Sequence, residues 1–152
     1  MYSGSPFTVT ASDTLSLPGS NQRADQVLPE VRILGDPQSY FDPLAYRPVT
    51  GARFGTSGYN SLRGPGTNNF DFSLYRTFRI TEKFSAQFRA EAFNLTNTPH
   101  FSNPSSNASN LQLNNDGSIR NLGGFTTITS TSGIGREGID ERVFRFGLRL
   151  AF

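Results

Sequence analysis

The side chain best suited to acid–base or metal chemistry in this sequence is its single histidine, His100. A Ser-His-Asp triad or a histidine-based zinc site in this chain would have to use it. His100 lies in a segment rich in proline and asparagine, and no partner follows at a recognisable spacing. The sequence has no cysteine, which excludes disulfides, thiolate metal sites and thiol nucleophiles. We therefore predict no catalytic and no metal-binding residue, and we expect that the protein is not an enzyme.

Glycine-rich and acidic segments do not predict a cofactor site either. The glycines at 64–66 and 133–135 are not followed by the Lys and Ser or Thr of a phosphate-binding loop. Asp116 and its Asn neighbours lack the acidic spacing of a calcium loop and predict a turn. The formal net charge is only +2, and the arginines are scattered rather than gathered in a basic block. We expect no cofactor and no nucleic-acid partner.

Six other charged residues follow a regular pattern, because each alternates with apolar neighbours along the chain. These residues are Asp71, Arg79, Arg89, Glu91, Arg145 and Arg149. Alternation places them on one face of a strand and the apolar residues on the other. If these strands belong to a membrane barrel, we expect the six residues to face its lumen. Their role there is either to pair with one another, which keeps the wall polar and solvated, or to contact a passing substrate or a plug.

The elements that carry this pattern are strands, predicted at about 6–11, 69–80, 84–95 and 140–152. The last strand alternates most strictly, and its apolar parity holds Phe144, Phe146, Leu148, Leu150 and Phe152. Strict alternation of this length is the signal of a strand with two different faces. Two residues break the pattern: Arg76 lies on the apolar parity, and Phe93 lies on the polar parity, where a twist or bulge is expected.

The connections between these strands are very unequal in length. Residues 81–83 form a tight hairpin, whereas 12–67 and 96–138 are long segments rich in Gly, Pro, Asn and Ser. Long structureless loops are uncommon inside compact soluble domains. Outer-membrane barrels combine short periplasmic turns with long external loops. With the turn at 81–83 in the periplasm, both long loops lie outside.

The apolar face of the last strand has a large area, since each aromatic side chain can bury roughly 150 to 250 Å². Another apolar surface must therefore cover it. Lipid can cover it, whereas a soluble fold needs a second apolar layer, and only 35% of the chain is hydrophobic. The predicted fold is all-β: an antiparallel transmembrane β-barrel fragment of about four strands with long irregular loops. The alternative is a small soluble or self-assembling β-sheet protein that binds a partner through its apolar face.

Several motifs, taken in order, resemble the closing part of TonB-dependent receptors of the Oar-like, acidobacterial kind. They are residues 58–66 (GYNSLRGPG), 69–74 (NFDFSL), 88–97 (FRAEAFNLTN), 99–101 (PHF) and the terminal 144–152 (FRFGLRLAF); residues 5–10 (SPFTVT) resemble a strand further upstream. The resemblance covers nearly the whole chain. It implies an outer-membrane barrel of about 22 strands with a plug, which takes up large nutrients with energy delivered by TonB.

The resemblance also implies which partners to expect. They are outer-membrane lipid, the rest of the barrel and the plug, the outer-membrane assembly machinery, and TonB, reached only through an N-terminal part that this chain lacks. The first residues show no signal peptide. We therefore expect the chain, residues 1–152, to be the C-terminal part of a longer barrel, without a plug domain and not competent for transport alone. The strand ending at Phe152 resembles the signal that the assembly machinery reads, and such an edge can bind another sheet edge.

Overall fold

The computed structural model describes residues 2–12, 22–132 and 141–152. The chain divides into two compact units. The first, called the sheet unit, comprises Met1–Tyr2, Thr67–His100 and Thr131–Phe152. The second, called the loop unit, comprises Ser3–Gly66 and Phe101–Ser130. Among the described residues, no helix has the length and apolar character needed to cross a membrane.

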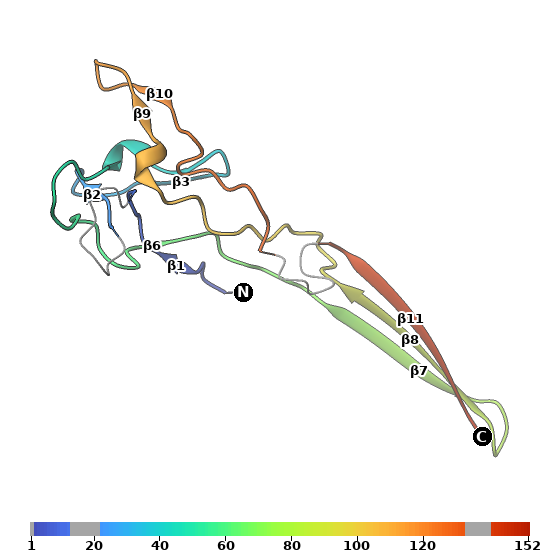
Figure 1. The fold of residues 1–152 in the computed structure, drawn as a ribbon. Coiled ribbons are helices and arrows are strands. Elements are labelled where there is room, and N and C mark those ends of the chain that lie inside the picture. Colours follow the sequence, from blue (N-terminus) through green and yellow to red (C-terminus); the bar gives the residue numbers. More distant parts are fainter. Residues whose placement is uncertain (1, 13–21, 133–140) are drawn as a thin grey trace. The chain divides into compact units, whose positions relative to one another are not determined.

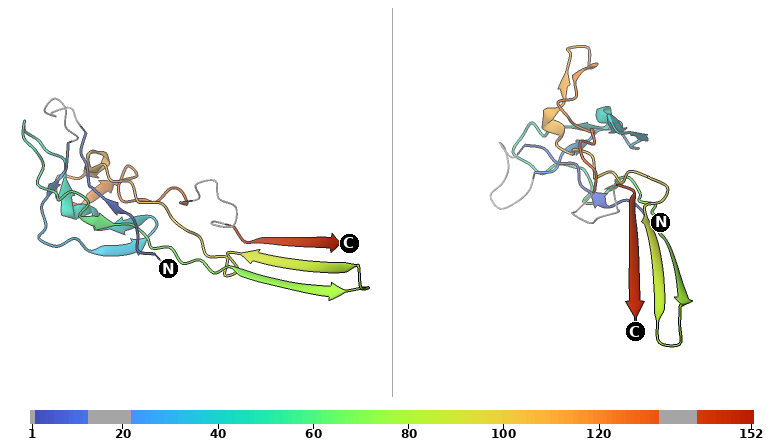
Figure 2. Two further views of the ribbon diagram at one scale, coloured as in Figure 1. Left: turned by 90° about the horizontal axis from the view of Figure 1, so that it is seen from below. Right: turned by 90° about the vertical axis from the view of Figure 1, so that its right-hand side faces the viewer.

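The sheet unit is built on three long antiparallel strands in the order β11-β8-β7 (Figure 1). Strand β7 runs from Phe72 to Arg79, β8 from Ser85 to Phe93 and β11 from Val143 to Ala151. Aromatic and β-branched residues favour extended backbone at many of these positions. The three strands lie side by side in both views of Figure 2. They fall inside the predicted ranges 69–80, 84–95 and 140–152; the expected start at Asp140 lies outside the described residues.

A short hairpin joins β7 to β8, as the sequence predicts. The backbone nitrogens of Ile80 and Thr81 both donate to the carbonyl oxygen of Phe84, at 2.9 and 3.1 Å. The Thr81 hydroxyl in turn accepts a hydrogen bond from the Phe84 nitrogen at 3.1 Å. The predicted tight turn is confirmed.

The pairing within the sheet is continuous. Strand β11 pairs with β8 from Val143 opposite Phe93 to Ala151 opposite Ser85, without a register shift. Strand β7 pairs with β8 equally regularly, from Phe72 opposite Ala92. The bulge expected at Phe93 is therefore absent from the pairing. Phe93 keeps its place on the polar face, where the guanidinium of Arg145 lies 5.1 Å from the centre of its ring.

The loop unit differs from its prediction, because segments expected to be irregular loops fold around a buried core. Phe41 lies at the centre of this core and contacts the rings of Phe7, Tyr46 and Phe125, at centroid distances of 5.8, 5.9 and 5.4 Å. Twelve buried residues form the cluster: Phe7, Val9, Ala11, Ala24, Tyr40, Phe41, Ala45, Tyr46, Leu62, Ala108, Leu111 and Phe125. Two of the three ring contacts are edge-on, an arrangement that the quadrupole of aromatic rings favours.

Short strands and single turns of 3-10 helix make up the rest of the loop unit. They are β1 (Pro6–Phe7), β2 (Asp25–Gln26), β3 (Ile33–Asp36), β4 (Ser39–Phe41), η2 (Pro43–Ala45), β5 (Tyr46–Arg47), β6 (Leu62–Arg63), η3 (Ala108–Asn110), β9 (Gln112–Leu113) and β10 (Ile119–Asn121). The strands pair as β1-β6, β2-β5, β3-β4 and β9-β10.

The prediction of a membrane strand at residues 6–11 is wrong. Only Pro6–Phe7 forms a regular strand, and it pairs with Leu62 and Arg63 rather than joining the large sheet. Its apolar residues Phe7 and Val9 are buried in the core of the loop unit. The alternation in this segment therefore places its apolar side chains in a protein core rather than against lipid.

Candidate functional site: the two faces of the large sheet

The register of the large sheet gathers apolar side chains on one face, which we call the apolar face. Directly paired residues of an antiparallel sheet lie on the same face. Phe144 is opposite Ala92, which is opposite Phe72, and Phe146 is opposite Ala90 and Leu74 in the same way. Leu148 and Leu150 continue this face toward the hairpin. The apolar residues predicted on one side of the last strand thus lie on the same face as apolar residues of β8 and β7.

The apolar face is not covered by any described part of the sheet unit. Phe146 and Leu148 are 72% and 69% exposed, although both are large hydrophobic residues. Neighbouring rings contact one another across the strands, for example Phe88 and Phe146 at 6.3 Å. A soluble monomer seldom exposes an apolar patch larger than a few hundred Å². This face therefore requires an apolar environment.

Phe152, the last residue, lies one position beyond β11. Its side chain is 94% exposed, and its ring lies 5.9 Å from that of Phe84 beside the hairpin. The two rings share the apolar parity with Ile80. An aromatic pair at the end of an apolar band is the arrangement found where membrane strands meet the interface.

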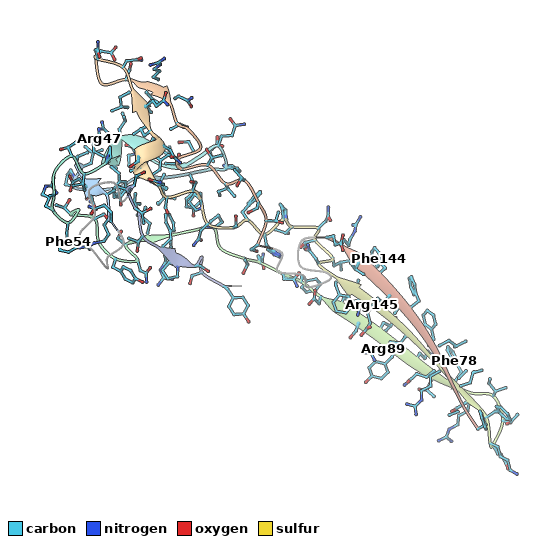
Figure 3. All side chains as sticks on the ribbon, in the orientation of Figure 1. Arg47, Phe54, Phe78, Arg89, Phe144 and Arg145 are labelled. Carbon is cyan, nitrogen blue, oxygen red and sulfur yellow. The ribbon has the colours of Figure 1, made fainter. Side chains whose placement is uncertain are left out.

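The opposite face of the sheet, called the polar face, carries five of the six charged residues predicted for it. Figure 3 shows Arg89 and Arg145 on the sheet together with Phe78 and Phe144 of the apolar face. Glu91 lies between two arginines: Arg89 donates to its carboxylate at 2.5 Å, and Arg145 is its direct cross-strand partner. Arg149 and Arg79 lie nearer the hairpin, in the rows of Gln87 and Ser85.

Asp71, the sixth residue, has a different position. It precedes β7, and its carboxylate accepts hydrogen bonds from the backbone nitrogen of Asn94 at 2.9 Å and from the side chain of Asn69 at 3.0 Å. The carboxylate thus joins the start of β7 to the end of β8. Sequence alternation alone assigned it to the polar face because it has the same parity.

Asn94 organises the end of the sheet opposite the hairpin, and sequence reasoning did not single it out. Its buried side chain accepts from the Thr98 nitrogen at 3.0 Å and donates to the Thr98 oxygen at 3.1 Å. Its own backbone is in the left-handed region, with a φ of +47°, which asparagine tolerates better than most residues. A buried asparagine that bonds both backbone groups of one residue fixes a turn, so its role is structural.

His100 has a structural role at the same end of the sheet. Its side chain is buried, and its Nε2 lies 3.0 Å from the carbonyl oxygen of Asn68. Because a carbonyl only accepts, Nε2 carries the proton in this contact. The carbonyl of His100 accepts from the Ser132 nitrogen at 2.6 Å. Three chain segments are thereby tied together where the chain enters and leaves the sheet.

Asp116 forms the turn that the sequence predicts. Its carboxylate accepts from the backbone nitrogen and the hydroxyl of Ser118, at 2.9 and 2.6 Å, between β9 and β10. Gly117 follows with a φ of +83°. Among residues 2–12, 22–132 and 141–152, no group of three His, Cys, Asp or Glu side chains is placed to hold a metal ion. The glycines at 133–135 lie outside the described residues.

Comparison with known proteins gives one family match. A family model described as an outer membrane beta barrel domain matches residues 1–139. The matched range includes the whole loop unit and strands β7 and β8 of the sheet unit, and it ends before β11. The comparisons with curated proteins and with solved structures gave no match.

Proposed function

Because this chain belongs to the family of outer membrane beta barrel domains and is therefore an outer-membrane protein, we propose that its large sheet forms part of the wall of a transport barrel. The apolar face of the sheet meets lipid, and the polar face meets a water-filled lumen. The observation that carries this proposal is the unbroken register of β11, β8 and β7, which separates exposed apolar from exposed charged side chains. An all-β fold with open sheets fits a barrel wall.

The dimensions of the strands support the same proposal. They contain eight, nine and nine residues, close to the roughly 9 to 11 that a tilted membrane strand needs. Hydrocarbon does not tolerate open sheet edges, so β7 and β11 need further strands of the barrel beside them. The soluble alternative is set aside, since an outer-membrane protein has lipid to cover this face.

More specifically, we propose a TonB-dependent receptor of the Oar-like kind, which takes up large nutrients and has no catalytic function. The sequence motifs at 58–66, 88–97 and 144–152 support this assignment. In this proposal the hairpin after β7 lies in the periplasm, and the connections near Thr67, His100 and Thr131 lie at the outer end of the sheet. The plug, TonB and the assembly machinery are the expected partners.

Two substitutions on neighbouring residues of β11 test the assignment of the faces. In the full receptor, Phe144→Asp puts a charge on the apolar face and is expected to abolish stable insertion into the outer membrane. Arg145→Gln changes the polar face and is expected to leave insertion intact. Insertion is measured as the folded, protease-resistant fraction in isolated outer membranes. Equal loss in both variants would refute the two-faced wall.

The transport proposal needs its own test. Cells that depend on a large nutrient for growth are compared with and without the gene, and with and without TonB. Uptake that requires the protein but is unchanged without TonB would contradict the TonB-dependent assignment and leave the barrel assignment standing.

A further inference from the structure

Charge is distributed unevenly along the polar face of the large sheet. In the half away from the hairpin, Glu91 forms an ion pair with Arg89 and lies opposite Arg145. In the half near the hairpin, the face carries Arg149 and Arg79. Neither of these two arginines forms an ion pair with any described residue, since the ion pairs within those ranges are Arg53–Asp25 and Arg89–Glu91. Positive charge is therefore partly offset by a carboxylate in one half, whereas the half near the hairpin has no acidic side chain on this face.

The register places these two arginines close enough to act on one ligand. Arg149 is in the row of Gln87 and Thr77, and Arg79 is in the next row on this face, beside Ser85. The rows are roughly 7 Å apart and the outer strands roughly 10 Å apart, from the ordinary spacings of a sheet. Two extended arginine side chains span that separation above β8.

The residues between the two arginines are neutral hydrogen-bonding groups. The side chain of Gln87 donates to the hydroxyl of Thr77 at 3.4 Å, and Ser85 adds another hydroxyl. On this face the rows of Arg149 and Arg79 contain no acidic side chain; Glu82 is in the turn, and the carboxylate of Phe152 follows Ala151. Guanidinium groups form planar, two-pronged hydrogen bonds with carboxylates and phosphates.

We propose that this half of the polar face binds the carboxylate or phosphate groups of solutes inside the barrel, with Arg79 and Arg149 as the cationic donors. The inference rests on the proposed function, because it needs the polar face to line a water-filled lumen. Positively charged side chains on the wall of a pore favour anions, and low-dielectric walls strengthen the effect. The two arginines therefore favour anionic solutes over neutral or cationic ones.

Cysteine reactivity tests the proposal cleanly, because the sequence contains no cysteine. Thr77→Cys places a thiol in the row of Arg149 and two residues from Arg79 on the same face, and Ser73→Cys places a control thiol in the row of Glu91 and Arg145. Each variant is made in the complete barrel that contains these strands, purified from outer membranes, returned to lipid vesicles and treated with sulfonate-bearing or ammonium-bearing methanethiosulfonate reagents. The sulfonate-to-ammonium rate ratio is expected to be several-fold higher at position 77 than at 73, and the difference to shrink in high salt.

Variants of the two arginines complete this test. Arg79→Gln with Arg149→Gln is expected to remove the difference between the two positions, whereas Arg79→Lys with Arg149→Lys is expected to keep it. If the glutamine variant does not fold, the salt dependence and the lysine variant still decide the outcome. Equal ratios at 77 and 73 in the unmodified background would overturn the proposal.

Binding itself is measured with inorganic pyrophosphate as the probe. Millimolar pyrophosphate is expected to slow the reaction of Thr77→Cys with an uncharged thiol reagent, compared with sodium chloride at the same ionic strength. An equal rate in both salts would contradict a binding site. Leu74→Cys, on the apolar face, separates this failure from that of the proposed function: if it reacts as fast as Thr77→Cys in vesicles, the assignment of the faces is wrong.

Discussion

Arg76 is the charged residue whose position is hardest to reconcile with lipid. The register places it on the apolar face, opposite Phe88 and in the row of Leu148. Its guanidinium lies 5.1 Å from the centre of the Phe78 ring, two positions nearer the hairpin. The side chain therefore extends along the apolar face toward the hairpin end, and the ring offers its cation a favourable partner. This direction is the one a snorkelling arginine takes toward an interface.

We predict that Arg76→Leu stabilises the complete barrel in a lipid bilayer. An arginine on the lipid face costs up to about 2–4 kcal/mol at the bilayer midplane and less near the interface. The free energy of unfolding from vesicles, measured by urea titration, should rise by an amount within this range. Thr77→Leu, on the polar face, is the control and should give no such gain. A loss of stability in Arg76→Leu would mean that this arginine has a carboxylate partner or faces water.

Asp25 is the residue with the clearest electrostatic role in the loop unit. Arg53 donates to both oxygens of its carboxylate, at 2.8 and 2.5 Å, and the backbone nitrogen of Thr56 donates at 3.2 Å. The hydrogen bonds from Arg53 are the main reason that the pKa of Asp25 lies below its ordinary value. The ionised carboxylate thus favours the folded loop unit.

We predict a loss of stability of the loop unit in acid that depends on Asp25. Because the pKa of Asp25 is lower in the folded state, its contribution is complete above the ordinary pKa of an aspartate and disappears as the pH falls through the folded value. Asp25→Asn should remove this part of the pH dependence. Hydrogen exchange of the Ala24 amide, which donates to Val9, reports the effect. An unchanged acid profile in Asp25→Asn would contradict it.

At the scale of elements, the loop unit depends on close backbone packing between segments far apart in the sequence. Gly4 lies against Gly64, and a Cβ atom added at Gly4 would be 1.7 Å from the Gly64 carbonyl oxygen. The Gly64 nitrogen also donates to the Ser5 oxygen at 3.0 Å. The sequence places Gly64 only within the long segment 12–67, which is rich in glycine and proline; the structure adds a packing reason for a glycine at this position.

We predict that Gly4→Ala destabilises the loop unit by about 1–3 kcal/mol, because a backbone atom cannot move aside as a flexible side chain does. Gly51→Ala is the matched control, since an added Cβ there meets nothing within 4 Å and its φ is not positive. Limited proteolysis of the loop unit measures both variants. Equal protease resistance of the two variants would show that the Gly4 contact does not matter for stability.

At the scale of the whole molecule, the large sheet determines what environment the protein needs. Three strands expose one apolar face and two edges, and the described residues of the sheet unit cover neither. Unpaired edges and exposed hydrophobic residues promote association between copies. The loop unit, by contrast, is built around a buried core of its own.

We predict that the 152-residue chain, expressed alone, aggregates in buffer and disperses in detergent. Analytical ultracentrifugation with and without detergent makes the comparison. A variant with Phe146→Ser and Leu148→Ser, which reduces the exposed apolar face, should need less detergent. A detergent-free monomer that unfolds cooperatively would contradict both this prediction and the proposed membrane wall.

The sequence by itself determined the features that depend on neighbouring residues. Alternation with period two predicted the three long strands and their two faces, because strand geometry repeats every second residue. The short segment 81–83 predicted the hairpin that joins β7 and β8. Membership in an outer-membrane family agrees with the barrel inferred from these local patterns.

Only the tertiary structure decided the features that depend on residues distant in the chain. The parity of Asp71 did not reveal its bond to Asn94, and the isolated His100 gave no sign of its contact with Asn68. Residues 6–11 alternate like a membrane strand, yet Phe7 packs on Phe41 in the core of the loop unit. Such contacts join irregular segments that have no period to read, so their partners are set by packing and hydrogen bonding rather than by local pattern.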